Sequence, residues 1–232
     1  TEKANVEAKP VQVAQKLVQE QGRELRSWWV EEMLSTDQPL VERMTMFWHN
    51  HFTSSIQKVR FVPSMYWQNV LFRREALGNF ATLLHAVARD PAMLVYLDGV
   101  RSVARQPNEN FGRELLELFT LGEGHYSEAD IKSAARAFTG WNYKGLEFVV
   151  NPAQHDAGSK TVLGKTGHFD GVQVIDIILS KPVTAEFVAT KIYKYFVREE
   201  VSPELRVQLG KLLRDSRYEI APFLEAVFSS KD

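Results

Sequence analysis

Apolar residues recur at intervals of three and four along most of this 232-residue chain, and this spacing constrains the fold more than any other feature. It places apolar side chains on one face of an α-helix, which then packs against other helices. The pattern changes between Asn142 and Gly171, where glycine is frequent and β-type runs occur at Phe148 to Val150 and Thr161 to Leu163. We therefore predict a mainly α fold, a multi-helix globular domain with a small β-hairpin or ordered loop insertion near residues 145–165.

Helix-starting signals mark where several of these helices begin. Proline suits the first turn of a helix because its missing N–H has no partner there in any case. Helices are accordingly expected to start near Pro10, Pro39 and Pro91. Ser127 with Asp130 is typical of a capping box, with Asp in place of the usual Glu, and predicts another helix start.

The remaining segments define the expected domain organisation. The polar residues 1–9 are predicted to be a flexible tail, and 52–62 and 99–107 are predicted to be loops. The main helical domain should then cover residues 10–181. Residues 182–232 should form C-terminal helices packed on it.

Composition narrows the classes of function. The net charge of −1 gives no overall attraction for nucleic acid, so no nucleic-acid partner is expected. No apolar run approaches the roughly 20 residues of a membrane-spanning helix. The chain has no cysteine, which excludes disulfides, thiolate metal sites and cysteine nucleophiles. A protein partner is compatible with this composition.

His49 and His51 are the first candidates for chemistry. Imidazole is a common metal ligand, and a His-x-His pair occurs in some metal sites. On a helix, however, side chains two residues apart point roughly 200° from each other. The pair can bind one ion only if the helix ends or distorts near Asn50. The alternative is that His49 lies on the negative end of the helix dipole while His51 caps or packs.

The segment Glu109 to Leu121 is predicted to be a strong helix ended by glycine. Its expected core stripe consists of Phe111, Leu115, Leu118 and Phe119. Asn110, Glu114 and Glu117 should lie along one flank, and Arg113 should pair with Glu117 at i,i+4. Glu109, Glu114 and Glu117 are the candidate catalytic carboxylates, because neighbouring carboxylates can share a cation or raise one another's pKa. A solvated face with an ion pair is the alternative.

His155 and Asp156 lie in the glycine-rich segment, with Gly158 and Lys160 close behind. A histidine, a carboxylate and an ammonium group on a loop are typical of a site. They are equally typical of tight turns, which favour Asp and Gly. Together with His49 and His51, His155 and Asp156 are the candidate metal ligands.

Several motifs in this chain resemble those of one known family. They are Glu42-Arg43-Met44, Phe47-Trp48-His49-Asn50-His51-Phe52, Ala76-Leu77-Gly78-Asn79-Phe80, Asp90-Pro91-Ala92-Met93-Leu94, Asn108 through Gly122, Thr139-Gly140-Trp141 and His155-Asp156 with Lys160. The chain thereby resembles the bacterial domain-of-unknown-function 1800 family. Gly112 departs from the alanine expected in that family. The resemblance implies a helical bacterial protein, often exported, and it brings no established activity.

Two functional hypotheses follow. The first is a structural or interaction domain of an exported or envelope-associated bacterial protein, with a buried polar network in which Arg43, Arg113 and Arg136 pair with motif glutamates. The alternative is a metal-dependent hydrolase-like enzyme using the His49/His51 and Glu114/Glu117 region. A divalent metal ion, its cofactor, would be held by His49, His51 and His155 with Glu114 or Asp156, and Glu109 or Glu117 would act as the base. This alternative requires two imidazoles and a carboxylate to converge on one point.

Overall fold

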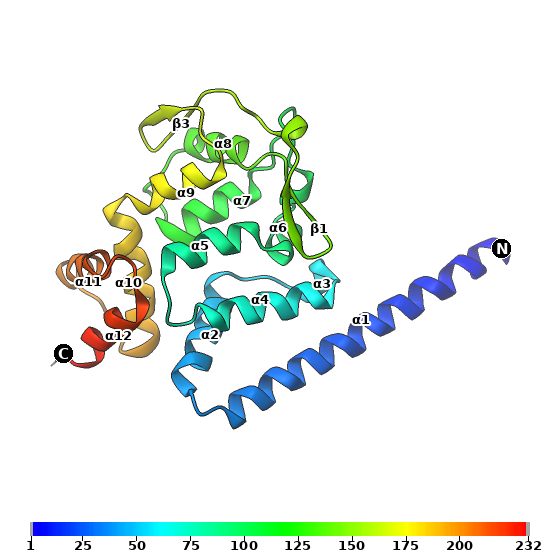
Figure 1. Ribbon diagram of the computed structural model, residues 1–232, viewed down its shortest axis with the longest axis horizontal. Helices are drawn as coiled ribbons and strands as arrows, with labels where there is room; N and C mark the ends of the chain where they lie inside the picture. The colour runs from blue at the N-terminus through cyan, green and yellow to red at the C-terminus, as the bar shows by residue number, and fades with distance from the viewer. Residues whose placement is uncertain (1, 231–232) are drawn as a thin grey trace.

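The computed structural model describes the backbone of residues 2–230 and the side chains of residues 12–230. Helices dominate this part of the chain, and two antiparallel two-stranded sheets interrupt them, so the predicted mainly α fold is confirmed. Figure 1 shows the helices gathered in one body from which the first helix projects. The helical elements before the first strand are α1 (Glu2–Ser35), α2 (Pro39–His51), α3 (Ile56–Val59), α4 (Val62–Arg74), α5 (Phe80–Arg89), α6 (Pro91–Tyr96), η1 (Gly99–Arg101), α7 (Glu109–Glu114), η2 (Leu115–Thr120) and α8 (Glu128–Ala137).

Helix α1 is much longer than the sequence predicts. It starts at Glu2, so residues 2–9 are helical where a flexible tail was expected, and Thr1 lies outside the described residues. Good helix formers in this stretch favour the helical conformation. Near its other end the helix is anchored: Trp29 Nε1 donates to Glu42 Oε2 over 3.1 Å, and the Trp28 ring lies 5.1 Å from that of Tyr66. Its other half extends away from the body (Figure 1).

The local capping rules hold for the central helices. The Asn79 side chain accepts hydrogen bonds from the first N–H groups of α5, and the Asp90 side chain accepts one from Met93 in α6. Ser127 and Asp130 form the predicted capping box of α8. The predicted loop at 52–62 is partly wrong, since it contains the short helix α3, whose start is capped by Ser55.

The helix predicted from Glu109 to Leu121 is not α-helical throughout. Its second half, η2, is a π-helix, in which Leu121 N–H bonds to Leu116 O. The wider turn of the π-helix changes which side chains of this segment face the core. The predicted core residues Phe111, Leu115 and Phe119 are buried, but the prediction is wrong for Leu118, which is 48% exposed while Leu116 is fully buried.

The insertion near 145–165 is confirmed as two hairpins. Strand β1 (Trp141–Lys144) pairs with β2 (Glu147–Val150), and after the 3₁₀ turn η3 (Pro152–Gln154), β3 (Lys160–Val162) pairs with β4 (Lys165–Gly167). Both pairs are antiparallel. Trp141 is buried, and the ring of Phe148 lies 4.9 Å from it, which holds the first hairpin on the helical body.

The C-terminal helices complete the core. They are α9 (Gly171–Leu179), α10 (Pro182–Phe196), α11 (Pro203–Asp215) and α12 (Ile220–Phe228). Backbone hydrogen bonds join them to the earlier part of the chain, since Phe80 N–H donates to Tyr218 O and Ile220 N–H donates to Gly78 O, each over 2.9 Å.

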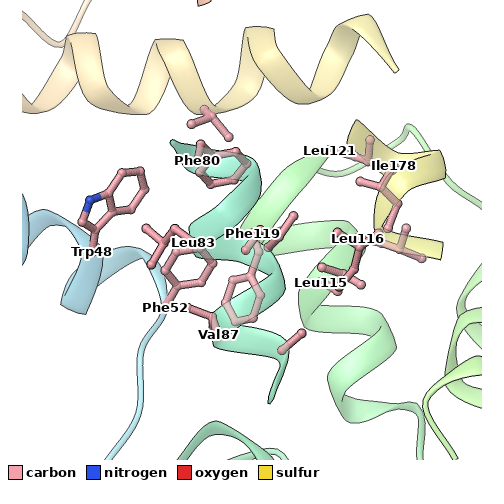
Figure 2. Packing of buried hydrophobic residues seen from close by; sticks show 14 of the residues in the cluster. Trp48, Phe52, Phe80, Leu83, Val87, Leu115, Leu116, Phe119, Leu121 and Ile178 are labelled. Atoms are coloured by element: carbon pink, nitrogen blue, oxygen red, sulfur yellow. The ribbon is translucent and has the colours of Figure 1, made fainter. Parts of the chain in front are cut away.

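Figure 2 shows the centre of the hydrophobic core. Side chains from α2, α5, η2 and α9 meet there, among them Trp48, Phe80, Phe119 and Ile178. The ring of Phe52, just beyond α2, lies 5.1 Å from that of Phe119. The same cluster continues into α10, α11 and α12, so one core spans the chain from the second helix to the last.

Close packing of α10 on α11 generates a stability prediction. A Cβ at Gly210 would lie 2.4 Å from Glu186 Cγ and 2.8 Å from its Cα, so Gly210→Ala forces the helices apart. We expect a loss of about 1–3 kcal/mol of unfolding free energy in urea titrations, although alanine favours helix formation. Gly22→Ala is the matched control. Its Cβ would come close to the tip of Ile56, which can rotate, and would lie at ordinary contact distance from Arg26 Nη1, so no loss is expected there. Equal effects of the two variants would contradict the packing argument.

Candidate functional site

The two motif histidines point to different partners. His51, which is only 3% exposed, places Nε2 3.0 Å from Phe119 O. Since a carbonyl can only accept, Nε2 carries the proton and Nδ1 does not. His49 accepts a hydrogen bond from Asn69 Nδ2 over 3.1 Å and packs against the rings of Trp29 and Phe72. The helical spacing therefore separates the two rings, as the alternative interpretation of the sequence expected.

Both imidazoles are held neutral. Burial, aided by the charge of Arg73, lowers the pKa of His49 to about 4. Burial and the charge of Lys191 hold the pKa of His51 well below its ordinary value. His51 Nδ1 is buried and has no hydrogen-bond partner within the described residues.

The contact made by His51 is explained by the end of η2. The last carbonyls of a helix have no partner within it and need other donors. Phe119 O receives His51 Nε2–H, and Leu118 O receives Lys191 Nζ over 3.3 Å. Two other helices, α2 and α10, thus cap the end of the π-helix, and the motif that contains His51 is joined directly to the motif Asn108 through Gly122.

The three candidate catalytic carboxylates have different surroundings and different partners. Glu109 pairs with Arg113 over 3.3 Å, and Arg113 pairs with Glu128 over 2.9 Å. The expected Arg113–Glu117 pair is therefore wrong, and Glu117 instead accepts a 2.6 Å hydrogen bond from the Tyr126 hydroxyl. Burial and the nearby charge of Glu117 raise the pKa of Glu114.

His155 and Asp156 connect the β insertion to α8 and to the residues that follow it. Arg136 Nε and Nη2 donate to the two carboxylate oxygens of Asp156 over 2.6 and 3.1 Å. His155 Nδ1 lies 2.9 Å from Thr139 O, and the buried Lys160 ammonium donates to Gly158 O over 2.9 Å. Arg136 therefore pairs with an aspartate and not with a motif glutamate.

Two further polar clusters were not predicted. Glu42 is buried and accepts hydrogen bonds from Arg73 and Trp29. In the second cluster, Gln68 Nε2 donates to Asp90 over 2.7 Å, and burial raises the pKa of Asp90 to about 7. Glu42 and Asp90 both lie inside the family motifs, and this position is the sequence signal that could have pointed to the two clusters. Arg43, expected to form an ion pair, lies 5.3 Å above the ring of Tyr195.

The four candidate metal ligands do not come together. His49, His51, His155 and Asp156 each contact a separate partner, as described above. Among the residues that the structure describes, no three His, Asp or Glu side chains gather in an arrangement that would hold a metal ion. The structure thus gives no support to the metal-binding prediction.

Fold and contacts define a helical domain with a double-hairpin insertion, in which polar motif residues link separate elements. The model of the family described as "Protein of unknown function (DUF1800)" matches residues 2–232, so the chain belongs to this family, as its motifs indicated. No curated protein and no solved structure matches the chain. Within residues 2–230, none of the helices combines the length and apolar character needed to cross a membrane.

The Arg136–Asp156 pair generates a pH-dependent prediction. Arg136 holds the pKa of Asp156 at about 2, below its ordinary value of 3.8. A depressed carboxyl pKa contributes stability above pH 4, and this contribution is lost as the pH falls from about 4 toward 2. We expect Asp156→Asn to lower the free energy of unfolding by about 1–2 kcal/mol at pH 7.

The difference between Asp156→Asn and the wild type should shrink below pH 4, in denaturant titrations repeated between pH 7 and pH 3. Asp215→Asn is the matched control, because its pair with Lys211 is exposed on α11. That change should cost less than about 0.5 kcal/mol. A loss for Asp156→Asn that is independent of pH would count against the ion pair as its cause.

Proposed function

We propose that this chain is a structural or interaction domain, whose motif residues hold the helices in a rigid arrangement that carries α1. The observation that supports this most directly is the buried His51–Phe119 contact, because it uses the side chain of a motif histidine to join two helices. A group that caps a buried carbonyl is already occupied and cannot serve as a metal ligand through the same nitrogen.

The other motif contacts support the same proposal. Each joins separate elements of the fold: Glu42 joins α1, α2 and α4 through Trp29 and Arg73, and Asp156 joins the β insertion to α8 through Arg136. Buried polar groups stabilise a fold only when they are hydrogen-bonded, and they then favour one arrangement over others. Such contacts are expected of a domain that keeps its shape while a partner binds.

The hydrolase alternative needed two imidazoles and one carboxylate within about 2–2.6 Å of one point. His49, His51 and His155 instead contact Asn69, Phe119 and Thr139 respectively. We therefore prefer the structural proposal. Export or envelope association, which the family resemblance implies, stays a prediction.

The stabilising role of His51 can be tested by substitution. His51→Phe keeps an aromatic ring but leaves the buried Phe119 carbonyl without a donor. We expect a loss of about 1–3 kcal/mol of unfolding free energy, measured by urea titration. His125→Phe is the control, because His125 is exposed at a glycine turn and should tolerate the change. A His51→Phe protein as stable as the wild type would refute the proposed role.

Metal addition separates the two hypotheses. With Zn²⁺ or Mn²⁺ at about 1 mM, we expect an unchanged melting temperature, because the imidazoles do not converge. A site with a Kd of about 10 μM would stabilise the fold by about 2.7 kcal/mol under these conditions, a shift of several degrees. Such a shift in the wild type, abolished by His49→Ala, would favour the hydrolase alternative instead.

A further inference from the structure

A groove of about 1090 Å³ separates the projecting half of α1 from α3. Ala14, Val18 and Gly22 line it from α1, and Ile56 lines it from α3. At Gly22 the two helices touch, since a Cβ there would lie 2.9 Å from Ile56 Cδ1. The lining of the groove extends along α1 on both sides of Gly22, from Ala14 to Arg26, on the helix that projects from the body (Figure 1).

The apolar stripe of α1 continues past the point where the body covers it. Ala14, Val18, Gly22, Leu25 and Trp29 fall within an arc of about 80° at 100° per residue. Gly22 is buried, and Leu25 and Trp29 are half-buried, whereas Ala14 is exposed. Amphipathic helices are stabilised mainly by packing of the apolar face. Ala14 and the half-buried Val18 are thus the part of the stripe that a further helix would cover.

Charge distinguishes the groove from the rest of the molecule. Its lining contains Lys16, Arg23, Arg26 and Arg60 but a single acidic residue, Glu20. Four cations and one carboxylate give the lining a net charge of +3, whereas the whole chain has a net charge of −1. A segment that fits both the apolar floor and this rim carries apolar residues on one side and carboxylates beside them.

We propose that the groove binds an acidic amphipathic helix of a partner protein, with its apolar stripe on Val18 and Ile56 and its carboxylates facing Arg23 and Arg26. This inference rests on the proposed function, and it names the class of partner. A second copy of α1 fits less well, because it would bring its own Lys16, Arg23 and Arg26 to the same rim. A nucleic acid would match the charge but leave the apolar floor uncovered.

A designed peptide tests the proposal on the whole 232-residue chain. The probe is a fluorescein-labelled 18-residue peptide with leucine at helical spacing and glutamate on the flanks. Fluorescence anisotropy should show this peptide binding at least about ten-fold tighter than a scrambled peptide or one with lysine for glutamate. Binding should weaken with added salt, because exposed charge pairs are screened.

Charge reversal locates the binding surface. Arg23→Glu with Arg26→Glu should raise the Kd of the acidic peptide at least about ten-fold. Lys211→Glu with Arg214→Glu is the matched control, since it has the same charge change and spacing on α11, away from α1 (Figure 1), and should leave the Kd unchanged. Val18→Asp should weaken binding as strongly, because it places a carboxylate on the apolar floor.

Four results would overturn this inference. They are absence of peptide binding, equal binding of the scrambled peptide, tighter binding of a single-stranded oligonucleotide, and a concentration-dependent dimer in sedimentation that Arg23→Glu with Arg26→Glu abolishes. None of these depends on the effect of His51→Phe on stability. A failure of the groove proposal is therefore distinguishable from a failure of the proposed structural role.

Discussion

The hydrogen bond from His51 to the Phe119 carbonyl is the contact on which the arrangement of the central helices depends. It lies inside the core, among the rings of Phe47, Trp48 and Phe52, where water cannot replace it. A carbonyl at a helix end needs a donor, and here a neighbouring helix supplies one. This hydrogen bond consequently fixes the position of α2 relative to η2. The surrounding apolar side chains pack around the two helices in that arrangement.

Charged contacts extend this arrangement outward. The Glu42–Arg73 pair, together with Trp29, holds the end of α1 on α2 and α4, and the Asp156–Arg136 pair holds the β insertion on α8. Each pair is partly shielded from solvent, so it has more influence than a fully exposed one. From the inside outward, the fold thus has an apolar core with a neutral histidine, then ion pairs near the surface, and then the projecting helix α1.

Most local signals in the sequence predicted local structure, but Pro10 lies inside α1 and does not mark its start. Pro39, Pro91 and the Ser127–Asp130 capping box mark helix starts because the responsible contacts lie within a few residues. The partners of His51 and Asp156 could not be predicted in this way, since Phe119 is 68 residues from His51 and Arg136 is 20 from Asp156. The π-helix was missed because its bonding pattern is selected by packing and not by residue preference. The two histidines were correctly expected to diverge if α2 stayed helical.

The π-helix has a consequence for insertions and deletions in this chain. Bonding of each N–H to the fifth preceding carbonyl encloses one more residue in each hydrogen-bonded ring than α-helical bonding would. Removing one residue between Leu115 and Thr120 would allow the segment to wind as an ordinary α-helix. The chain beyond would then be displaced by one position, and a different carbonyl would face the imidazole of His51. The number of residues in this segment thus determines which carbonyl lies against His51.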